Sequence, residues 1–468
     1  MPNIILNKRI FFKIFINKYT IFSMVFLFIQ QLIIASSMLW IYRLSASVVE
    51  HKNIMCYFLL FGLSLILVCI PVSISAYFLE KSKRLSFSSY IDSFSRKYYL
   101  LSCHRNNKLL KEDVEPWVVN EANMLIEECH KFFHDALSIT LNNCLNVIVL
   151  FTFIGPNLIY GYLFVFIFVL ISFRLFKTKI RENALSLQRS RKKLTEHLMY
   201  AWDNIIIGNQ YNYNIWRNLF KQMWSSWRDT SLLSVVLSNL ASAFCTILST
   251  IPVVLNVGYL IYLNINNTVY LAGLVATLPR QIQILQHFYF FSHYLVKWQD
   301  LKPKLSNLFQ AVNREIMPVN IEDKINWQAI SISMHGSPRG VNSLGAFMEL
   351  LGVLNSGRIQ IQGSNGAGKS TILYAIKEKL GDGAYLLPTH ATLIYEHHTQ
   401  MSHASSGEST VLKLKELSAL CSNSKAPSVL LLDEWDANLD RLNKATMHDM
   451  LEKLSARLVV IEVRHNVA

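Results

Sequence analysis

Long apolar runs alternate with charged segments through the first two thirds of the chain. Six runs are candidates for membrane-spanning helices, because a span needs about 20 mostly apolar residues. They cover residues 21–42, 54–78, 136–154, 158–173, 232–263 and 269–295. The last third instead alternates short strand-like segments with turns. The pattern predicts a membrane domain over residues 1–310 and a second, α/β domain over residues 311–468.

The distribution of basic residues predicts how the spans are oriented. The chain has 468 residues, of which 52% are hydrophobic and 16% charged, and a formal net charge of +14. Lys and Arg concentrate between spans two and three and between spans four and five, whereas the links at 155–157 and 264–268 are short and uncharged. Because cytoplasmic loops of inner-membrane proteins collect Lys and Arg, the basic segments and both termini are predicted to be cytoplasmic. The lipid bilayer then explains the charge without a nucleic-acid partner.

The long basic segments are too long to be unstructured loops of a compact protein. Within residues 183–220, Leu194, Leu198, Trp202 and Ile205 recur at helical spacing among charged residues. This spacing predicts helices that extend the spans into the cytoplasm as stalks. Two interpretations stay open: a stalk that packs only on its neighbours, and a stalk whose tip contacts the C-terminal domain.

The sixth predicted span carries polar side chains. They are Arg280, Gln281, Gln283, Gln286 and His287. Polar groups at membrane depth are costly unless they face protein or water, so Arg280 is a candidate for the translocation path. Equally open are the interpretations that Arg280 snorkels or pairs within the bundle, and that the span lies nearer the interface.

A glycine-rich turn lies between a predicted strand at residues 358–362 and a predicted helix at residues 369–380. It consists of Gly363, Ser364, Asn365, Gly366, Ala367, Gly368, Lys369 and Ser370, and matches GxxxxGK[ST] in its strand, loop, helix setting. In such a loop the backbone N–H groups and the helix N-terminus bind phosphate, the lysine reaches the β- and γ-phosphates, and the hydroxyl holds Mg²⁺. The sequence therefore predicts that ATP and Mg²⁺ bind here.

An apolar run at residues 428–432 ends in Asp433 and Glu434. This pattern is typical of a buried parallel strand that presents carboxylates at its C-terminal end. Such runs are common by chance, but together with the glycine-rich turn this one predicts a Walker B strand. Asp433 is expected to organise Mg²⁺, and Glu434 to polarise the water that attacks the γ-phosphate.

These motifs, in this order, resemble those of ABC transporters whose membrane and nucleotide-binding domains share one chain. Residues 404–408 (ASSGE) resemble the ABC signature, residues 438–440 (NLD) the D-loop, and His465 the switch histidine. Each of these three motifs alone is weak. The resemblance implies a catalytic role for His465 beside Glu434. It also implies ATP contacts at Thr371, Ser405, Ser406, Gly407, Glu408 and Asp440, of which the signature residues would touch ATP held by a second copy.

The resemblance covers nearly the whole chain, because exporter-type ABC transporters have six spans, long cytoplasmic stalks and short outer loops. Around Glu115, Pro116 and Trp117 the membrane half is loosely similar to the peptide-transporter and peroxisomal-type branch. The sequence DEW at residues 433–435 is similar to that of transporters of cyclic peptides and siderophores. A peptide or peptide-like molecule is therefore the expected cargo.

Three departures from the family concern coupling and adenine binding. Thr389 stands where the family has a glutamine that senses Mg²⁺ and the membrane domain. Only about 15 residues separate Thr389 from Ser405, where the family inserts a helical subdomain whose groove receives the stalk tips. His335 is the candidate nearest to the position of the residue that stacks on adenine.

The resemblance predicts an ATP hydrolase that exports a peptide-like molecule across the inner membrane as a homodimer. Each ATP would lie between residues 363–370 of one copy and residues 405–408 of the other. The expected fold is an α-helical six-span membrane domain followed by an α/β P-loop NTPase domain of the ABC type with a reduced helical subdomain. The alternative is a membrane-anchored ABC-type ATPase that acts as a sensor or regulator. The departures favour this alternative, and the polar residues of span six oppose it.

Overall fold

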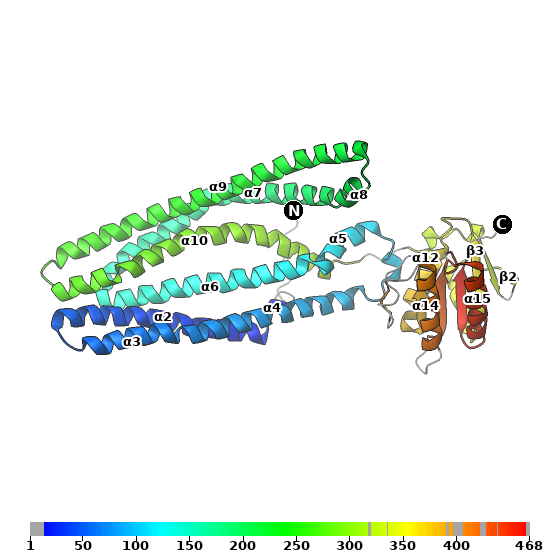
Figure 1. Cartoon of the computed structure of the whole chain (residues 1–468), viewed down its shortest axis with the longest axis horizontal. Coiled ribbons are helices and arrows are strands. Elements are labelled where there is room, and N and C mark those ends of the chain that lie inside the picture. Colours follow the sequence, from blue (N-terminus) through cyan, green and yellow to red (C-terminus); the bar gives the residue numbers. More distant parts are fainter. Residues whose placement is uncertain are drawn as a thin grey trace. The chain divides into compact units, whose positions relative to one another are not determined.

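Two units of different secondary structure make up the computed structural model (Figure 1). It describes residues 14–316, 320–334, 336–389, 393–395, 406–421, 427–437 and 439–464. The first unit comprises Met1–Phe94 and Glu115–Arg314, and the second comprises Ser95–Val114 and Glu315–Ala468. The second unit thus includes residues 95–114, which lie between the second and third predicted spans. The predicted boundary at residue 310 separates only the C-terminal part of this unit.

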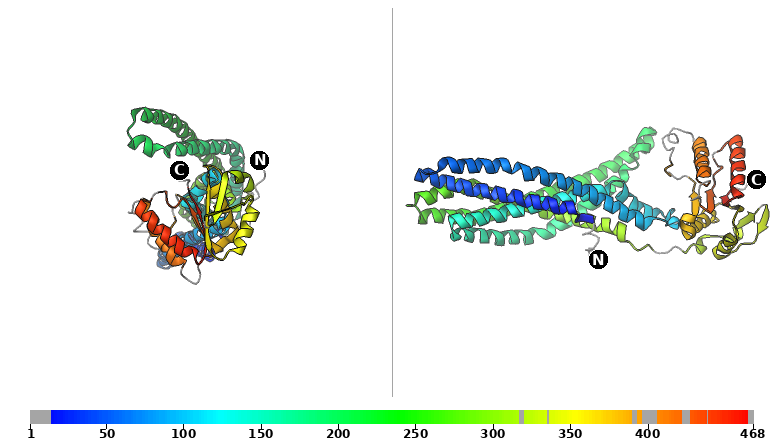
Figure 2. Two further views of the ribbon diagram at one scale, coloured as in Figure 1. Left: turned by 90° about the vertical axis from the view of Figure 1, so that its right-hand side faces the viewer. Right: turned by 90° about the horizontal axis from the view of Figure 1, so that it is seen from below.

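Helices that run side by side, most of them long, form the first unit (Figure 2). They are α2 (Lys18–Glu50), α3 (Ile54–Leu67), α4 (Cys69–Tyr98), α6 (Glu121–Ile154), α7 (Ile159–Leu198), α8 (Ala201–Ile206), α9 (Gln210–Leu263) and α10 (Thr268–Asn313). The predicted turns at 155–157 and 264–268 fall between α6 and α7 and between α9 and α10. Large apolar side chains such as Met55 and Ile66 of α3 are exposed on this unit, as expected of helices that face lipid.

Five stretches of the described chain are long and apolar enough to cross a membrane. They are Lys18–Glu50, Ile54–Tyr98, Glu121–Ile154, Pro156–Leu198 and Gln210–Leu263. The chain is therefore a multi-pass membrane protein. The prediction of six such spans is wrong at the sixth: α10 covers residues 269–295 but is not among the five, because Arg280, Gln281 and Gln283 lower its hydropathy. The cytoplasmic location of both termini assumed an even number of spans and stays a prediction.

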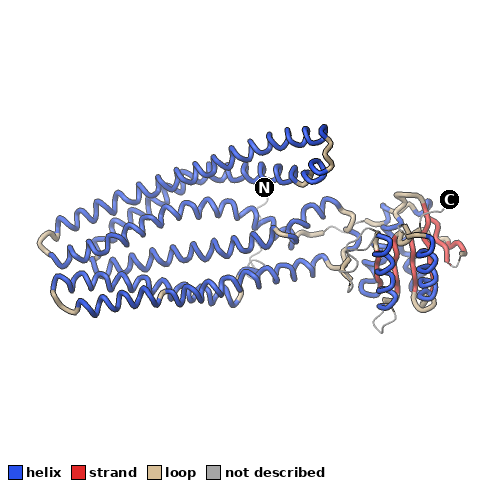
Figure 3. The backbone as a smooth tube through the Cα atoms, viewed as in Figure 1, coloured by secondary structure: helices blue, strands red, loops and turns tan. Residues whose placement is uncertain are grey.

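A six-stranded mixed sheet forms the centre of the second unit (Figure 3). The strands are β1 (Ile330–Met334), β2 (Ser337–Arg339), β3 (Gly357–Gly363), β4 (Ala384–Leu387), β5 (Val429–Asp433) and β6 (Val459–Val463), in the order β2-β1-β3-β6-β5-β4. β3, β6, β5 and β4 are parallel, and β1 pairs antiparallel with β2 and β3. Every residue of β5 and β6 is buried, which explains their continuous apolar runs.

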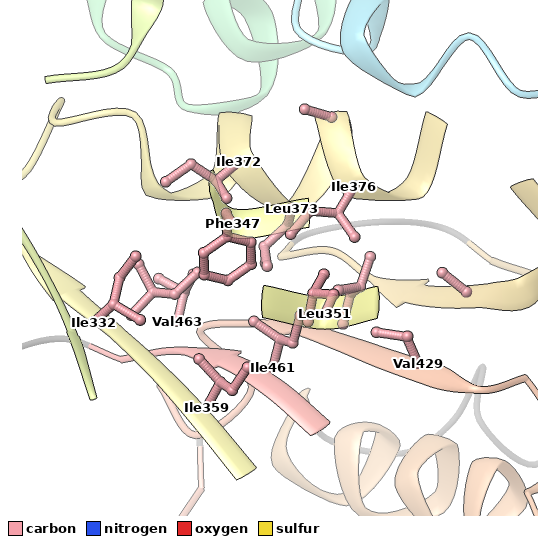
Figure 4. Close-up of a cluster of buried hydrophobic side chains, with 14 of the residues drawn as sticks. Ile332, Phe347, Leu351, Ile359, Ile372, Leu373, Ile376, Val429, Ile461 and Val463 are labelled. Atoms are coloured by element: carbon pink, nitrogen blue, oxygen red, sulfur yellow. The ribbon is translucent and has the colours of Figure 1, made fainter. Parts of the chain in front are cut away.

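Helices cover both faces of this sheet. They are α11 (Leu344–Val353), α12 (Lys369–Leu380), α14 (Ser406–Leu420) and α15 (Arg441–Ser455). Phe347 of α11 and Ile372 of α12 pack on Val429 and Ile461 on one face (Figure 4). Because side chains alternate along a strand, Leu430 and its neighbours on the other face pack with α14 and α15.

The predicted fold class is wrong. The structure is 78% helical, and its six short strands form too little sheet for a full P-loop NTPase domain. The strands have only three to seven residues each. Length is one physical reason: between α12 and β5 the described chain forms only β4 and α14 besides a short turn, η5 (Gly381–Gly383). What the second unit retains is a small mixed sheet with the glycine-rich loop at one edge.

Candidate nucleotide-binding site

The glycine-rich loop joins the end of β3 to the start of α12, and these elements confirm the predicted strand and helix. Gly366 and Gly368 have φ of 81° and 98°, in the left-handed region that favours glycine. A Cβ atom on Gly363 would lie 2.5 Å from the Ala329 carbonyl oxygen, and one on Gly368 would lie 2.6 Å from that of Lys324. Both positions therefore require glycine on steric grounds.

The Lys369 side chain is held inside this loop. It is only 6% exposed, and its Nζ donates to the carbonyl oxygens of Gly363 at 2.7 Å and Ser364 at 3.1 Å. Ser364 and Asn365 are exposed at the tip of the loop. The ammonium group and the N-terminus of α12 together give the loop a positive electrostatic character, which suits it to a phosphate chain.

Ser370 and Asp433 meet across the sheet edge. β3 and β5 are parallel strands on either side of β6, so their C-terminal ends meet the same edge. Ser370 Oγ donates to Asp433 Oδ1 at 2.9 Å. Burial raises the pKa of the Asp433 carboxyl, and the hydrogen bond from Ser370 opposes this shift. The pair supplies the oxygen ligands that Mg²⁺ prefers.

A protein-only metal cage is absent from the described part of the chain. No group of three or more His, Cys, Asp or Glu that could hold a metal ion occurs there. Mg²⁺ is commonly bound by one or two protein side chains together with substrate phosphates and water. Ser370 and Asp433 fit that kind of site.

Glu434 follows β5 in an unusual backbone conformation. Its φ is 49°, in a region that costs a residue other than glycine about 1 kcal/mol or more. Its N–H donates to the carbonyl oxygen of Val463 in β6 at 3.1 Å. Strain of this kind concentrates at functional sites, and here it turns the chain directly after Asp433.

Thr389 forms a hydrogen bond with the end of β5, the predicted Walker B strand. Its Oγ1 donates to the carbonyl oxygen of Asp433 at 2.9 Å, so the residue in place of the family's glutamine contacts the candidate site. Arg105 in turn donates from Nη2 to the Thr389 carbonyl oxygen at 3.0 Å and from Nη1 to the Tyr374 hydroxyl oxygen at 2.5 Å. A chain of hydrogen bonds therefore runs from Arg105 to the strand that carries Asp433.

The segment that carries Arg105 packs on α12 through further contacts. It contains the 3-10 turn η1 (Ser102–His104) and the start of α5 (Lys108–Val119). The Cys103 N–H donates to Glu378 Oε2 at 2.9 Å, and the Tyr99 hydroxyl donates to Asp382 Oδ1 at 2.5 Å. In the sequence, Arg105 is one of several basic residues between the second and third predicted spans, and no local pattern marks its partners.

A buried ion-pair network supports the candidate site from β6. Glu462 is 0% exposed. It accepts hydrogen bonds from Arg358 Nε at 3.0 Å, Gln360 Nε2 at 2.9 Å and Trp435 Nε1 at 3.0 Å. Burial alone would raise the pKa of Glu462, but the bond from Arg358 and the positive charge of Arg464 outweigh it and lower the pKa. Trp435 directly follows Glu434, so the network anchors the turn after β5.

The remaining predicted site residues fall into two groups: some lie outside the described residues, and the others lie in or next to helices α12, α14 and α15. His335, Ser405, Asn438 and His465 lie outside the described residues. Ser406 and Gly407 begin α14, and Glu408 is exposed in its first turn. Asp440 caps α15 by accepting the Asn443 N–H at 2.7 Å, and Thr371 lies in the first turn of α12. The site that the structure assembles thus consists of the loop 363–370 with Asp433, Glu434 and Thr389.

Two comparisons with known proteins found no match. No protein-family model matches the chain, and no curated protein matches it. Any function must therefore be argued from the residues and their geometry.

Proposed function

We propose that the chain binds ATP with Mg²⁺ at the loop 363–370 and uses hydrolysis to export a peptide-like molecule across the inner membrane as a homodimer. The contact between Ser370 and Asp433 at the end of a complete GxxxxGK[ST] loop carries this proposal, because it joins the two parts of a phosphate and Mg²⁺ site. The basic segments between the spans support a cytoplasmic location for the nucleotide.

Each residue of the site has a separate task in this proposal. The loop N–H groups and Lys369 bind the phosphates, while Ser370 and Asp433 would hold Mg²⁺, which neutralises charge on the β- and γ-phosphates. Glu434 orients and polarises the attacking water. The resemblance to ABC transporters adds the expectation that residues 405–408 of a second copy complete the site.

The hairpin tip at α8, between α7 and α9 (Figure 1), supports a dimer. Met199 is 79% exposed and Trp202 73% exposed, although both follow a charged cytoplasmic stalk. Exposed apolar residues that gather in one place typically mark an interaction site. A second copy of the chain that covers this tip would remove it from water.

The alternative function, a membrane-anchored ATPase that senses or regulates without transport, draws on the reduced second unit and on Thr389 in place of glutamine. The hydrogen bonds that link Arg105, Thr389 and Asp433 oppose it. They tie the segment Ser95–Val114, whose two ends continue along the chain into the first unit, to the strand that carries Asp433. Transport requires a link of this kind.

ATP hydrolysis by the purified chain in lipid tests the proposed function. The wild type should hydrolyse ATP, a library of random hexapeptides should stimulate it, and Glu434→Gln should lower the rate roughly a hundredfold or more. Nucleotide titration should show that Glu434→Gln still binds ATP. No turnover under any condition, with binding retained, would contradict transport and favour the sensor.

Replacement of Arg105 by alanine tests how the membrane segments act on the site. The ratio of peptide-stimulated to basal ATP hydrolysis should fall to about one, because the link to Thr389 and Asp433 is lost, and Arg105→Lys should restore part of it. Lys108→Ala, which removes an exposed charge from the same segment, is the matched control. Equal ratios for Arg105→Ala and Lys108→Ala would show that Arg105 has no part in coupling.

A further inference from the structure

Polar side chains gather in the first unit where α2, α6 and α10 pack on one another. We call this set the polar seam: Gln31, Ser37, Asn142, Asn143, Asn146, Arg280, Gln283 and His287. Asn142 Nδ2 donates to Gln31 Oε1 at 2.8 Å, and His287 Nδ1 lies 2.7 Å from Asn143 Oδ1. Since α2 and α6 are candidate membrane spans, the seam lies within the membrane part of the chain.

Arg280 brings a positive charge to the seam, and its side-chain partners among the described residues are neutral. Its Nη1 donates to Gln283 Oε1 at 2.6 Å and its Nη2 donates to Ser37 Oγ at 3.1 Å, and both partners are neutral. The apolar segments at 18–49, 51–79, 136–181 and 230–299 contain no Asp or Glu. Charged side chains in a membrane face the bundle interior or water and pair with other charged groups or with polar groups of the protein. The partners of Arg280 are neutral, so an anionic molecule that reaches the seam would find an uncompensated positive charge there.

The same helices also hold polar oxygen atoms without a partner. Asn146 is 0% exposed and Gln281 is 2% exposed, and neither Asn146 Oδ1 nor Gln281 Oε1 has a hydrogen-bond partner among the described residues. Burying an acceptor without a partner is unfavourable. Such atoms can accept N–H groups of a ligand.

From these observations we infer that the polar seam binds the free carboxylate of a peptide-like molecule, with Arg280 as its charged partner and Asn146 as an acceptor for its amide N–H groups. A guanidinium group is shaped to bind a carboxylate through two hydrogen bonds. The seven residue steps from Arg280 to His287 span about 10 Å of helix, which matches about three extended residues. The inference that the bound molecule is the cargo rests on the proposed function, but binding itself does not require ATP hydrolysis.

Two matched peptide libraries test this site. Both contain N-acetylated random hexapeptides without Asp or Glu, one with a free C-terminal carboxylate and one with a C-terminal amide. The full-length chain, in phosphatidylcholine nanodiscs without nucleotide, should retain the carboxylate library at least roughly tenfold better, as expected for a hydrogen-bonded charge pair. In Arg280→Gln the ratio should fall to about one, and Arg280→Lys should recover part of it.

Arg174→Gln is the matched control, because it removes the same charge from an exposed position of α7 and should keep the wild-type ratio. The ratio is insensitive to a partial loss of folded protein, which lowers retention of both libraries alike. A wild-type ratio near one, a preference that survives in Arg280→Gln, or no retention of either library would overturn the inference. So would phosphatidylglycerol binding that depends on Arg280 without any preference between the libraries, since the site would then hold a lipid headgroup.

ATP-driven accumulation of the libraries in vesicles separates this inference from the proposed function. If the carboxylate preference is absent while accumulation depends on Glu434, only the assignment of the polar seam fails. If the preference depends on Arg280 and ATP moves neither library, the seam binds carboxylates and the transport proposal fails.

Discussion

Replacement of Lys369 by alanine should lower the affinity for ATP at least about a hundredfold. The Lys369 ammonium is buried inside the loop, where it would make charge-assisted hydrogen bonds with phosphate, each worth about 1.5–3 kcal/mol. The variant also loses the two bonds to the Gly363 and Ser364 carbonyl oxygens that fix the shape of the loop. Titration with a fluorescent ATP analogue measures the effect directly.

Lys379→Ala is the control for this variant, because Lys379 is exposed in the same helix and should bind ATP like the wild type. Glu434→Gln provides the opposite contrast, with binding kept and hydrolysis lost. If Lys369→Ala binds ATP as tightly as Lys379→Ala, the loop is not the nucleotide site. The proposed role of Asp433 in binding Mg²⁺ would then fail as well.

Replacement of Arg358 by leucine should destabilise the second unit by about 3 kcal/mol, the lower end of the usual cost of breaking a buried ion pair, because Arg464 still lies 3.1 Å from Glu462. Arg358 is 5% exposed and Glu462 is 0% exposed, and two hydrogen bonds join them. Hydrogen exchange of the β3 and β6 amides reports the opening free energy of this sheet separately from the helical unit.

The double variant Arg358→Leu with Glu462→Leu should recover much of that loss, because both buried charges are removed together. Glu452 and Arg464 also lose an ion pair in this variant, but their side chains are more exposed. Arg457→Leu, at an exposed position, should change the free energy by no more than about 0.5 kcal/mol. A single Arg358→Leu variant as stable as Arg457→Leu would show that the pair is not needed for the fold.

The ion pair between Arg358 and Glu462 makes the stability of the second unit depend on pH. The pKa of Glu462 is lower in the folded chain than its ordinary value, so its contribution is complete above the pKa of the unfolded chain. That contribution is lost as the pH falls through the lower, folded value. After correction for the intrinsic exchange rate at each pH, the opening free energy that hydrogen exchange of β6 reports should therefore fall on acidification in the wild type and change less in the double variant.

Local sequence patterns predicted the parts of the candidate site that are local. The spacing from Gly363 to Ser370 predicts a strand, a loop and a helix, and the structure confirms them. This prediction is possible because the loop conformation depends on glycines that lie within a few residues of one another. Parallel strands also explain why Asp433 reaches Ser370 from far along the chain.

The predictions that failed, and the contacts that were missed, concern features that a short stretch of sequence does not contain. The number of apolar spans is wrong because α10 has the length of a span but not its hydropathy, owing to Arg280 and its polar neighbours. The size of the sheet depends on how many strands assemble, which single motifs do not reveal. Arg105 and Tyr374 are 269 positions apart, and Arg358 and Glu462 are 104 apart, so neither pair leaves a periodic signal.

The inclusion of Ser95–Val114 in the second unit has a consequence for biosynthesis. The chain passes between the two units at residues 94–95, 114–115 and 314–315, so the second unit is discontinuous in sequence. Ser95–Val114 is synthesised early. It can dock on α12 only after Tyr374 and Glu378 have emerged from the ribosome. A fragment that starts at residue 315 would expose the surface that Cys103 and Arg105 cover. Studies of the second unit in isolation would need to supply this segment, either as a fused linker or as an added peptide.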